Sequence, residues 1–307
     1  MTSAPLTILY EHPAWFAPLF AELARQDIPY RAVSITDHGF DPAAPAPPSP
    51  IVFNRVAMSS FLREPEHPIF YAQALFEHWE GLGARVLNGS RALAIDASKA
   101  RQLALIRRLG LDIPATRIVH RARDIPAAAA QLRFPVLVKA DIGGAGAGIE
   151  RYDTADELAA AIAEQRTPAG VNGVILVQEY APRRGGRITR VETLGGRYLY
   201  AIDIASSGDT FDLCPADACA VDRPPVTMTA AQPPAALVAA AERIAKAAGL
   251  DVGGVEYLID DRDGRACFYD INALSNFVAR PLDVLGWDPH ERLVAHVRSI
   301  IAEGRKG

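Results

Sequence analysis

Apolar and polar positions along the chain repeat with the periods of strands and helices in alternation. Short apolar runs at residues 6–10 (LTILY) and 51–54 (IVFN) predict buried strands, and residues 14–26 and 68–82 have the spacing of amphipathic helices. The strands YRAVSI and RVLN follow the same pattern, and a Pro-rich segment, DPAAPAPPSP, separates the two halves. This alternation predicts an N-terminal α/β domain over residues 1–92.

A second unit is predicted over residues 93–182. A helix begins near Ser98 and ends near Gly110, and two apolar strands, PVLVKA and VILVQEY, follow the strand TRIVH and a helix near 123–132. Thr154 and Glu157 have the spacing of a capping box that opens another helix.

The third unit is predicted over residues 183–307. The strands RITRVETL and RYLYAID are joined by a Gly-Gly hairpin turn, and a Pro-rich loop at 223–234 leads into a helix over 235–248. The strands GGVEYLI and ACFYDIN and a terminal helix complete the unit. The fold class is therefore α/β with α+β lobes.

Composition excludes several classes of protein. Half of the 307 residues are hydrophobic and the formal charge is −4, so the chain is neither disordered nor basic enough to predict a nucleic-acid partner. Cys214, Cys219 and Cys267 lack CxxC spacing, which favours reduced cysteines over a disulfide framework or a zinc site. The first residues lack the pattern of a signal peptide, and no apolar run approaches the roughly 20 residues of a membrane span. We therefore expect a cytoplasmic protein without a membrane partner.

The glycine-rich run GGAGAG, residues 143–148, is weak evidence for a phosphate site when taken alone. It matches neither GxxxxGK[ST] nor GxGxxG, although small residues would let backbone N–H groups approach phosphate oxygens. A flexible hairpin turn is an equally good interpretation. Lys139 lies four residues before this run, and its ammonium would reach a phosphate there. Lys99, in the first turn of a predicted helix, is either exposed or paired with an anion. Each lysine alone favours a surface position over a site.

Two acidic residues near the C-terminus carry more information. If the hairpin GVEYLIDDRDGRACFYDIN pairs symmetrically about Asp263, Glu256 lies opposite Asp270, and Asn272 shares a face with Asp270. Like charges facing each other destabilise a sheet, and a bound divalent cation would remove that conflict. Two carboxylates and an amide oxygen suit Mg²⁺, whereas a solvent-facing acidic patch is the alternative. The three aspartates of the turn, including Asp260, are expected to be solvated.

In order and spacing, these segments resemble the ATP-grasp superfamily, especially its RimK-like (ribosomal-protein glutamate ligase) and glutathione synthetase branch. The segments that carry the resemblance are SKARQLALIRRLGLDIPATRIV, FPVLVKADIGGAGAGI, VQEYAP, GLDVGGVEYL and FYDIN, within roughly residues 88–280. The N-terminal region resembles the family's preceding α/β domain only in layout. The resemblance also suggests a homo-oligomer.

The resemblance implies a role for each matching residue. It implies residues that contact the nucleotide phosphates, a hinge strand that binds adenine, and an arginine that faces the transferred phosphate. It also implies ligands for two Mg²⁺ ions, with Mn²⁺ as a substitute metal. The phosphate contacts are Lys99, Lys139, Gly143, Gly144, Gly146 and Gly148; the hinge is Gln178, Glu179, Tyr180 and Ala181; the arginine is Arg190, with Lys139 as a second catalytic residue; and the metal ligands are Glu256, Asp270 and Asn272.

Three departures from the family pattern concern the ribose and the substrate. Ile188 replaces an aspartate two residues before Arg190, and no acid follows the hinge in APRRGG. Leu274, Ser275 and Asn276 replace the family's Ser-Pro-Gly beside the acyl-acceptor region. The substrate therefore cannot be assigned from a close relative.

The predicted activity is an ADP-forming ligase that joins a carboxylate to an amine or a thiol through an acyl-phosphate. The alternatives are an ATP-grasp phosphotransferase and a non-catalytic nucleotide-binding module. Arg55 and Ser59 follow a predicted parallel strand, where α/β sheets place ligands, and Arg55 would pair with a substrate carboxylate. A surface arginine with an N-cap serine is the alternative. Asn276 is a further candidate substrate contact, while Glu11 and His12 have weaker support.

Overall fold

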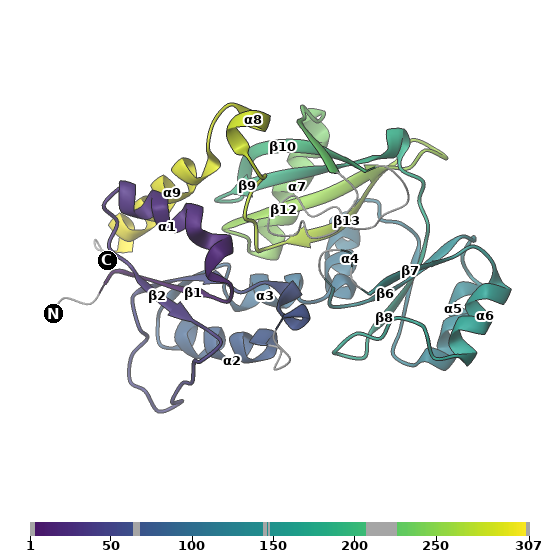
Figure 1. Ribbon diagram of the computed structural model, residues 1–307, viewed down its shortest axis with the longest axis horizontal. Helices are drawn as coiled ribbons and strands as arrows, with labels where there is room; N and C mark the ends of the chain where they lie inside the picture. The colour runs from purple at the N-terminus through teal and green to yellow at the C-terminus, as the bar shows by residue number, and fades with distance from the viewer. Residues whose placement is uncertain (1–3, 64–67, 144–145, 147, 207–225, 305–307) are drawn as a thin grey trace.

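The computed structural model describes residues 4–63, 68–143, 146, 148–206 and 226–304, and in this part of the chain three sheets follow one another (Figure 1). The first is parallel with the order β2-β1-β3-β4, and its strands are β1 (Leu6–Tyr10), β2 (Arg31–Ser34), β3 (Ile51–Arg55) and β4 (Arg85–Leu87). Residues of β1 and β3 are buried on both faces, which explains their continuous apolar character. The helices of this region are η1 (Pro13–Phe16), α1 (Ala17–Arg25), η2 (Met58–Leu62) and α2 (Pro68–Gly81).

Two short helices lead from the first sheet to the second, α3 (Ser90–Asp96) and α4 (Lys99–Arg108). Helix α4 begins at Lys99 because the Ser98 side chain accepts a hydrogen bond from the Arg101 N–H. It ends before Gly110, whose φ of +75° is the left-handed conformation expected after a helix.

The second sheet is antiparallel, with the order β5-β8-β6-β7. Its elements are β5 (Thr116–Val119), η3 (Ala122–Asp124), α5 (Ile125–Ala129), β6 (Val136–Ala140), β7 (Ile149–Tyr152), α6 (Ala155–Ala163) and β8 (Ile175–Glu179). Thr154 caps α6 as predicted, because its side chain accepts from the Glu157 N–H at 3.2 Å. The Glu157 carboxylate accepts in turn from the N–H of Asp153, one residue earlier than in a standard capping box.

The third sheet is also antiparallel, with the order β11-β10-β9-β12-β13. Its elements are η4 (Arg184–Gly186), β9 (Arg187–Leu194), β10 (Arg197–Ser206), β11 (Val226–Ala230), α7 (Ala235–Ala248), β12 (Val252–Ile259) and β13 (Ala266–Asn272). Helix α7 packs on one face of this sheet through a core that includes Val191, Val255 and Ala241. Strand side chains alternate, so Ile188, Arg190 and Glu192 lie on the other face.

The polypeptide ends with α8 (Pro281–Leu285) and α9 (Pro289–Gly304). Helix α9 lies beside α1 (Figure 1). A single apolar core joins the first sheet, α1, α9 and the third sheet. Helix α4 precedes the second sheet but packs on α7 and β13. The boundaries at residues 92 and 182 remain a prediction.

Several predicted elements need correction. The helix expected over 14–26 begins as a 3₁₀ turn at Pro13, and the one near 123–132 is shorter than predicted. Helix α3 and strand β7 were not predicted. A Pro-rich loop was expected where β11 lies, and this segment is a strand because it pairs with β10. Cys267 is a free, buried thiol, whereas Cys214 and Cys219 lie outside the described residues.

Candidate active site

Two carboxylates face each other at the edge of the third sheet. Glu256 on β12 pairs directly with Asp270 on β13, in the register predicted from the sequence. The ladder then shifts by one residue, so that Tyr269 is set out of the pairing and its hydroxyl donates to Glu256 Oε2 at 2.9 Å. Asn272 lies on the same side, with its amide 3.4 Å from Glu256 Oε1.

Two cations meet these acids from different elements. Lys99 Nζ, on the first residue of α4, donates to Asp270 Oδ1 at 2.6 Å. Arg190 on β9 donates from Nη1 to Glu256 Oε1 at 3.1 Å and from Nε to Glu192 Oε1 at 2.6 Å. A cation in the first turn of a helix opposes the helix dipole, and Asp270 supplies the anionic partner that Lys99 needs there.

These contacts shift the pKa of each group. Burial raises the pKa of Glu256, and the facing charge of Asp270 raises it further. Burial lowers the pKa of Lys99, but the ion pair with Asp270 outweighs it, so the net shift is upward. Arg190 follows the same rule, because Glu192 and Glu256 outweigh its desolvation. The two cations therefore stay charged, while the facing carboxylates remain in conflict.

Lys139 approaches the same centre from β6. Its ammonium donates to Gln178 Oε1 on the neighbouring strand β8 at 2.6 Å and lies 6.0 Å from the centre of the Tyr269 ring. Burial lowers the pKa of Lys139 to about 7, and the nearby charge of Lys99 contributes to the shift. Within the residues that the structure describes, Lys139 forms no ion pair of the kind that Lys99 forms, so an anion here would be a favourable partner.

The glycine-rich segment connects β6 to β7 beside Lys139. Gly146 and Gly148 have φ values of 76° and 72°, and a Cβ atom on Gly148 would lie 2.9 Å from the Ala140 Cβ. Glycine is therefore required at position 148 for both conformation and space. Gly143 is partly buried, and Gly144 lies outside the described residues.

Asp141 ties the start of this segment to the first turn of α4. Its carboxylate is 1% exposed and accepts from the Ala100 N–H at 2.7 Å and from the Asn172 amide at 2.7 Å. A carboxylate at a helix N-terminus is stabilised by the helix dipole. The contact places Lys99 and Lys139, from separate elements, around one centre.

The predicted hinge follows β8. The N–H groups of Glu179 and Tyr180 donate to the carbonyls of Ala115 and Pro135, at 2.9 Å each, so these two donors are committed to the fold. Ala181 is buried, and the Arg151 guanidinium lies 4.4 Å from the centre of the Tyr180 ring. Adenine contacts through the backbone would therefore fall to other groups of this strand.

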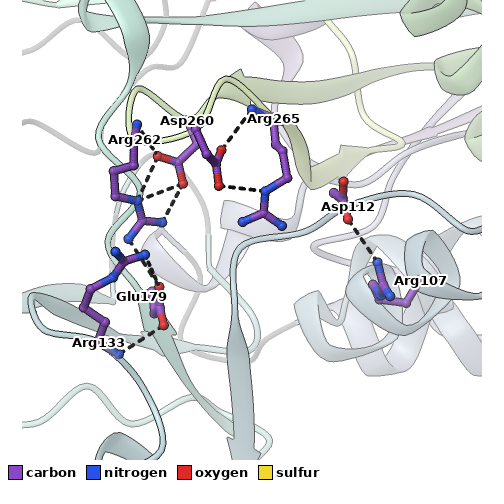
Figure 2. A network of polar contacts seen from close by, with 8 residues as sticks. Arg107, Asp112, Arg133, Glu179, Asp260, Arg262 and Arg265 are labelled. Carbon is purple, nitrogen blue, oxygen red and sulfur yellow. Dashed lines mark hydrogen bonds and ion pairs between the residues drawn. The ribbon is translucent and has the colours of Figure 1, made fainter.

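The side chain of Glu179 belongs to a network that joins the second and third sheets. Figure 2 shows Glu179 between Arg133 and Arg262, with Arg262 also against Asp260. Asp260 is 1% exposed, so the expectation that it is a solvated loop residue was wrong. The isolated bridge between Asp260 and Arg183 explains the difference, because it draws the hairpin end against the segment after β8.

The structure brings two of the three candidate substrate residues together. Arg55, at the end of β3, donates from Nη2 to Asn276 Oδ1 at 3.1 Å and to the carbonyl of Ser275. It is 2% exposed, so the alternative of a surface arginine was wrong. Ser59 lies elsewhere, within 3.3 Å of Arg63, which forms a bidentate ion pair with Glu11.

Two acids of this site were missed in the sequence. Glu192 shares a face with Arg190, and period-two alternation along RITRVETL would have revealed it. Asp96, the last residue of α3, lies close enough to Asp270 and Lys99 to interact with their charges. Burial raises the pKa of Asp96 to about 7, with Asp270 adding to the shift. No pattern in the sequence marked α3, so Asp96 carried no signal.

The donor set fits a hard divalent cation. Glu256 and Asp270 present carboxylate oxygens on one side of the β12–β13 hairpin, and the Asn272 amide lies beside them with its nitrogen toward Glu256. A cation there would relieve the repulsion by Asp270, which adds to the effect of burial in raising the pKa of Glu256. Among the described residues, no group of three or more His, Cys, Asp and Glu side chains is arranged to hold a metal. The two carboxylates would therefore need the Asn272 amide, phosphate oxygens or water to complete the coordination shell of the metal.

Comparison with known families identifies the architecture. Residues 96–277 match the family model of the carbamoyl-phosphate synthase L chain, ATP binding domain, which is more than half of the chain. The chain belongs to this family, within the ATP-grasp superfamily. The matched region includes Lys99, Lys139, Arg190 and both facing carboxylates.

Curated ATP-grasp relatives match a shorter stretch. A probable alpha-L-glutamate ligase of Enterobacter sp. (strain 638) and the ribosomal protein bS6–L-glutamate ligase of Escherichia fergusonii are each 34% identical over 142 residues. These matches cover 46% of this chain and 46% of each relative, so the chain spans about half the length of the relatives it matches.

Solved structures share the ATP-grasp fold over nearly the whole chain. The ATP-grasp ligase PsnB complexed with a phosphomimetic variant of its minimal precursor, Mg and ADP has a TM-score of 0.71 at 17% identity, with 97% of this chain and 99% of that chain covered. A RimK domain protein from Sphaerobacter thermophilus has a TM-score of 0.70 at 18% identity, with coverages of 95% and 99%. None of the described helices has the length and apolar character that a membrane crossing needs.

Proposed function

We propose that this ATP-grasp protein is an ATP-dependent, ADP-forming ligase that joins a substrate carboxylate to an amine or a thiol through an acyl-phosphate. The observation that carries the proposal is the convergence of Lys99, Lys139 and Arg190 on the facing pair Glu256 and Asp270. Phosphoryl transfer depends mainly on positioning and on cations that stabilise developing negative charge. The ligase names of the curated relatives support the same activity.

Lys139 and Lys99 would bind the phosphates of ATP. Lys139 donates to the uncharged amide of Gln178, and burial, together with the charge of Lys99, lowers its pKa. Lys99 has three N–H donors, so it can hold Asp270 and still present donors to a phosphate. The backbone of Gly143, Gly146 and Gly148, with Gly144, would cover the phosphates, and Gln178, Glu179, Tyr180 and Ala181 would line the adenine.

Arg190 would stabilise charge on the transferred phosphoryl group and on the acyl-phosphate. Its guanidinium is 4% exposed and held by Glu192 and Glu256 at two of its nitrogens, so its orientation is fixed before substrate arrives. Exclusion of water from this buried centre would protect the acyl-phosphate from hydrolysis.

Glu256, Asp270 and Asn272 would hold two Mg²⁺ ions. Mn²⁺ would also bind at these positions in place of Mg²⁺. The metal would supply Lewis-acid polarisation and charge neutralisation at the phosphate oxygens. The ion pairs of Asp270 with Lys99 and of Glu256 with Arg190 hold both carboxylates in place.

Hydroxylamine trapping tests the proposal, because hydroxylamine converts an acyl-phosphate into a stable hydroxamate. The chain would be incubated with Mg-ATP, a pool of small and peptide carboxylates, and hydroxylamine. A hydroxamate with stoichiometric ADP and phosphate supports the ligase. ADP with a phosphorylated acceptor that hydroxylamine does not intercept supports the phosphotransferase, and bound ATP without any ADP supports the non-catalytic module.

A further inference from the structure

Strand β13, which carries Asp270 and Asn272, lies at the outer edge of the third sheet. It pairs with β12 on one side, and in the part of the chain that the structure describes no further strand of this sheet lies beyond it. Backbone groups along such an edge have no ladder partner, so other parts of the chain or water must satisfy them. The contacts along this edge therefore show which residues hold the two predicted metal ligands in place.

Gln102 on helix α4 takes the place of a neighbouring strand at Ile271. Its Oε1 accepts from the Ile271 N–H at 3.0 Å, and its Nε2 donates to the Ile271 carbonyl at 2.9 Å. Nε2 also donates to the carbonyl of Asp96 at 3.2 Å. The side chain is 1% exposed, and a rotated amide would set its NH₂ group against the Ile271 N–H. The orientation of the Gln102 amide is therefore fixed.

The backbone at Ile271 determines where its two neighbours point. Strand side chains alternate, so the Ile271 side chain is buried in the core beneath α7, whereas Asp270 and Asn272 lie on the opposite face. The ladder to β12 shifts by one residue directly beside Asp270, and such an irregularity weakens the pairing locally. Hydrogen bonds from Gln102 to Ile271 therefore hold both ligands through the backbone between them.

Lys99 reaches the same strand from the same helix. Lys99 and Gln102 are three residues apart on α4, so they lie on one face of the helix. Lys99 donates to the Asp270 carboxylate at 2.6 Å, while Gln102 holds the backbone one residue further along β13. Leu105 and Ile106 anchor α4 in the core that it shares with β13. Helix α4 is therefore a rigid support for the metal ligands.

We propose that Gln102 is a positioning residue for the metal site, and that its amide holds Asp270 and Asn272 in the orientation that Mg²⁺ needs. The inference rests on the proposed function for the role of these two residues as metal ligands. Mg²⁺ demands near-ideal octahedral geometry, so displacement of its ligands weakens binding. Loss of a residue that orients metal ligands costs about 10- to 100-fold in metal affinity.

Calorimetric titration of the ADP complex of the full chain with Mg²⁺ tests this role without catalysis. Gln102→Met keeps the length of the side chain but removes its hydrogen bonds, and Gln102→Asn keeps the amide but withdraws it from Ile271. Each variant should raise the Kd for Mg²⁺ by about 10- to 100-fold. The Kd for ADP without Mg²⁺ should stay within about threefold of the wild type, because the phosphate contacts are unchanged.

Thr193→Val is the matched control. Thr193 is also buried in this sheet, and its hydroxyl donates to the carbonyl of Gly253 at 3.0 Å, three residues before Glu256 on β12. Loss of this bond should lower the midpoint of urea denaturation without changing the Kd for Mg²⁺. An unchanged Kd in a folded Gln102 variant, or an equal rise in Thr193→Val, would contradict the positioning role. A wild-type ADP complex that does not bind Mg²⁺ would contradict the proposed function, and the role of Gln102 with it.

Amide hydrogen exchange in the wild type needs no variant, and it decides alone if neither Gln102 variant folds. The Ile271 N–H, on the outer edge of β13, should exchange as slowly as the amides that pair with β12, because Gln102 holds it. Exchange of Ile271 at the rate of an exposed edge amide would overturn the proposal.

Discussion

Lys99 Nζ lies 2.6 Å from Asp270 Oδ1, which joins the first residue of α4 to the edge strand β13 across 171 positions of sequence. Both side chains are less than one-fifth exposed. Asp270 also faces Glu256 across the ladder, so this carboxylate interacts with a cation and with a like charge at once. That combination makes Asp270 the residue at which substitution should separate metal binding from folding.

Asp270→Asn should abolish the response to Mg²⁺. The change keeps the shape of the side chain but removes one of two anionic ligands, so Mg²⁺-dependent ADP formation should fall by about 100-fold or more. Thermal unfolding of the ADP complex, titrated with Mg²⁺, provides a second measurement. Asp261→Asn, at a 60% exposed side chain, is the control. Unchanged Mg²⁺ dependence in Asp270→Asn would rule out the assigned role.

Nucleotide affinity should weaken above neutral pH because of Lys139. Its lowered pKa of about 7 means that the ammonium is mostly neutral at pH 8.5, and binding of a phosphate must then be accompanied by proton uptake. The Kd for ATP should rise by about tenfold between pH 7.5 and 8.5. Calorimetry in buffers of different ionisation enthalpy would measure the proton directly.

Lys139→Arg is the matched variant for this test, since arginine stays protonated throughout the range. Its affinity should be nearly independent of pH from 7 to 9. A wild-type Kd that is equally flat would show that Lys139 is already charged in the free protein.

Arg262→Gln should destabilise the junction between the second and third sheets. Asp260 is 1% exposed and depends on Arg262 for its ion pair, and Arg262 also reaches Glu179 (Figure 2). Loss of this partner should lower the free energy of unfolding by about 2 kcal/mol, measured by urea denaturation. Arg265→Gln, whose ion pair with Asp263 is exposed, should cost at most about 1 kcal/mol. Equal effects of the two changes would argue against a buried ion pair at Asp260.

Asp96→Asn should stabilise the ligand-free protein at alkaline pH. The pKa of Asp96 is raised from 3.8 to about 7, so the folded state binds a proton that the unfolded state has released, and stability falls as pH rises between these values. A shift of about three pKa units corresponds to about 4 kcal/mol, so the variant should gain up to about 4 kcal/mol over the wild type at pH 8 and almost nothing at pH 4. Urea denaturation at both pH values would measure the difference in the free energy of unfolding between the variant and the wild type. The variant would instead be the less stable protein at pH 8 if a cationic partner kept Asp96 ionised.

Much of the fold could be predicted because local signals agreed with tertiary structure. Apolar runs, the Thr154 cap and Gly110 after α4 indicated most elements, and the symmetry of the hairpin about Asp263 placed Glu256 opposite Asp270. Strand β11 was missed because its side chains are largely exposed and its existence depends on pairing with β10. Pairing of that kind leaves no periodic signal.

The site was predictable only in part, for a similar reason. Arg190 and Lys139 were predicted from their place in an ordered set of segments, and the facing acids from the symmetry of their hairpin. Asp96, in contrast, depends on a helix, α3, that had no sequence signal. Asp260 was misjudged because its burial comes from the bridge to Arg183, far away in the sequence. Contacts between distant segments decide which charged residues are buried, and one sequence does not contain them.

Mass spectrometry of the products formed from Mg-ATP and a pool of carboxylates, amino acids and thiols would show whether the chain is a ligase. We expect a condensed product whose mass equals the sum of the two substrates minus water, together with one ADP and one phosphate per product. Asp270→Asn, run in parallel, should form none. A phosphorylated acceptor in place of the condensed product, or the same product from both proteins, would contradict the account.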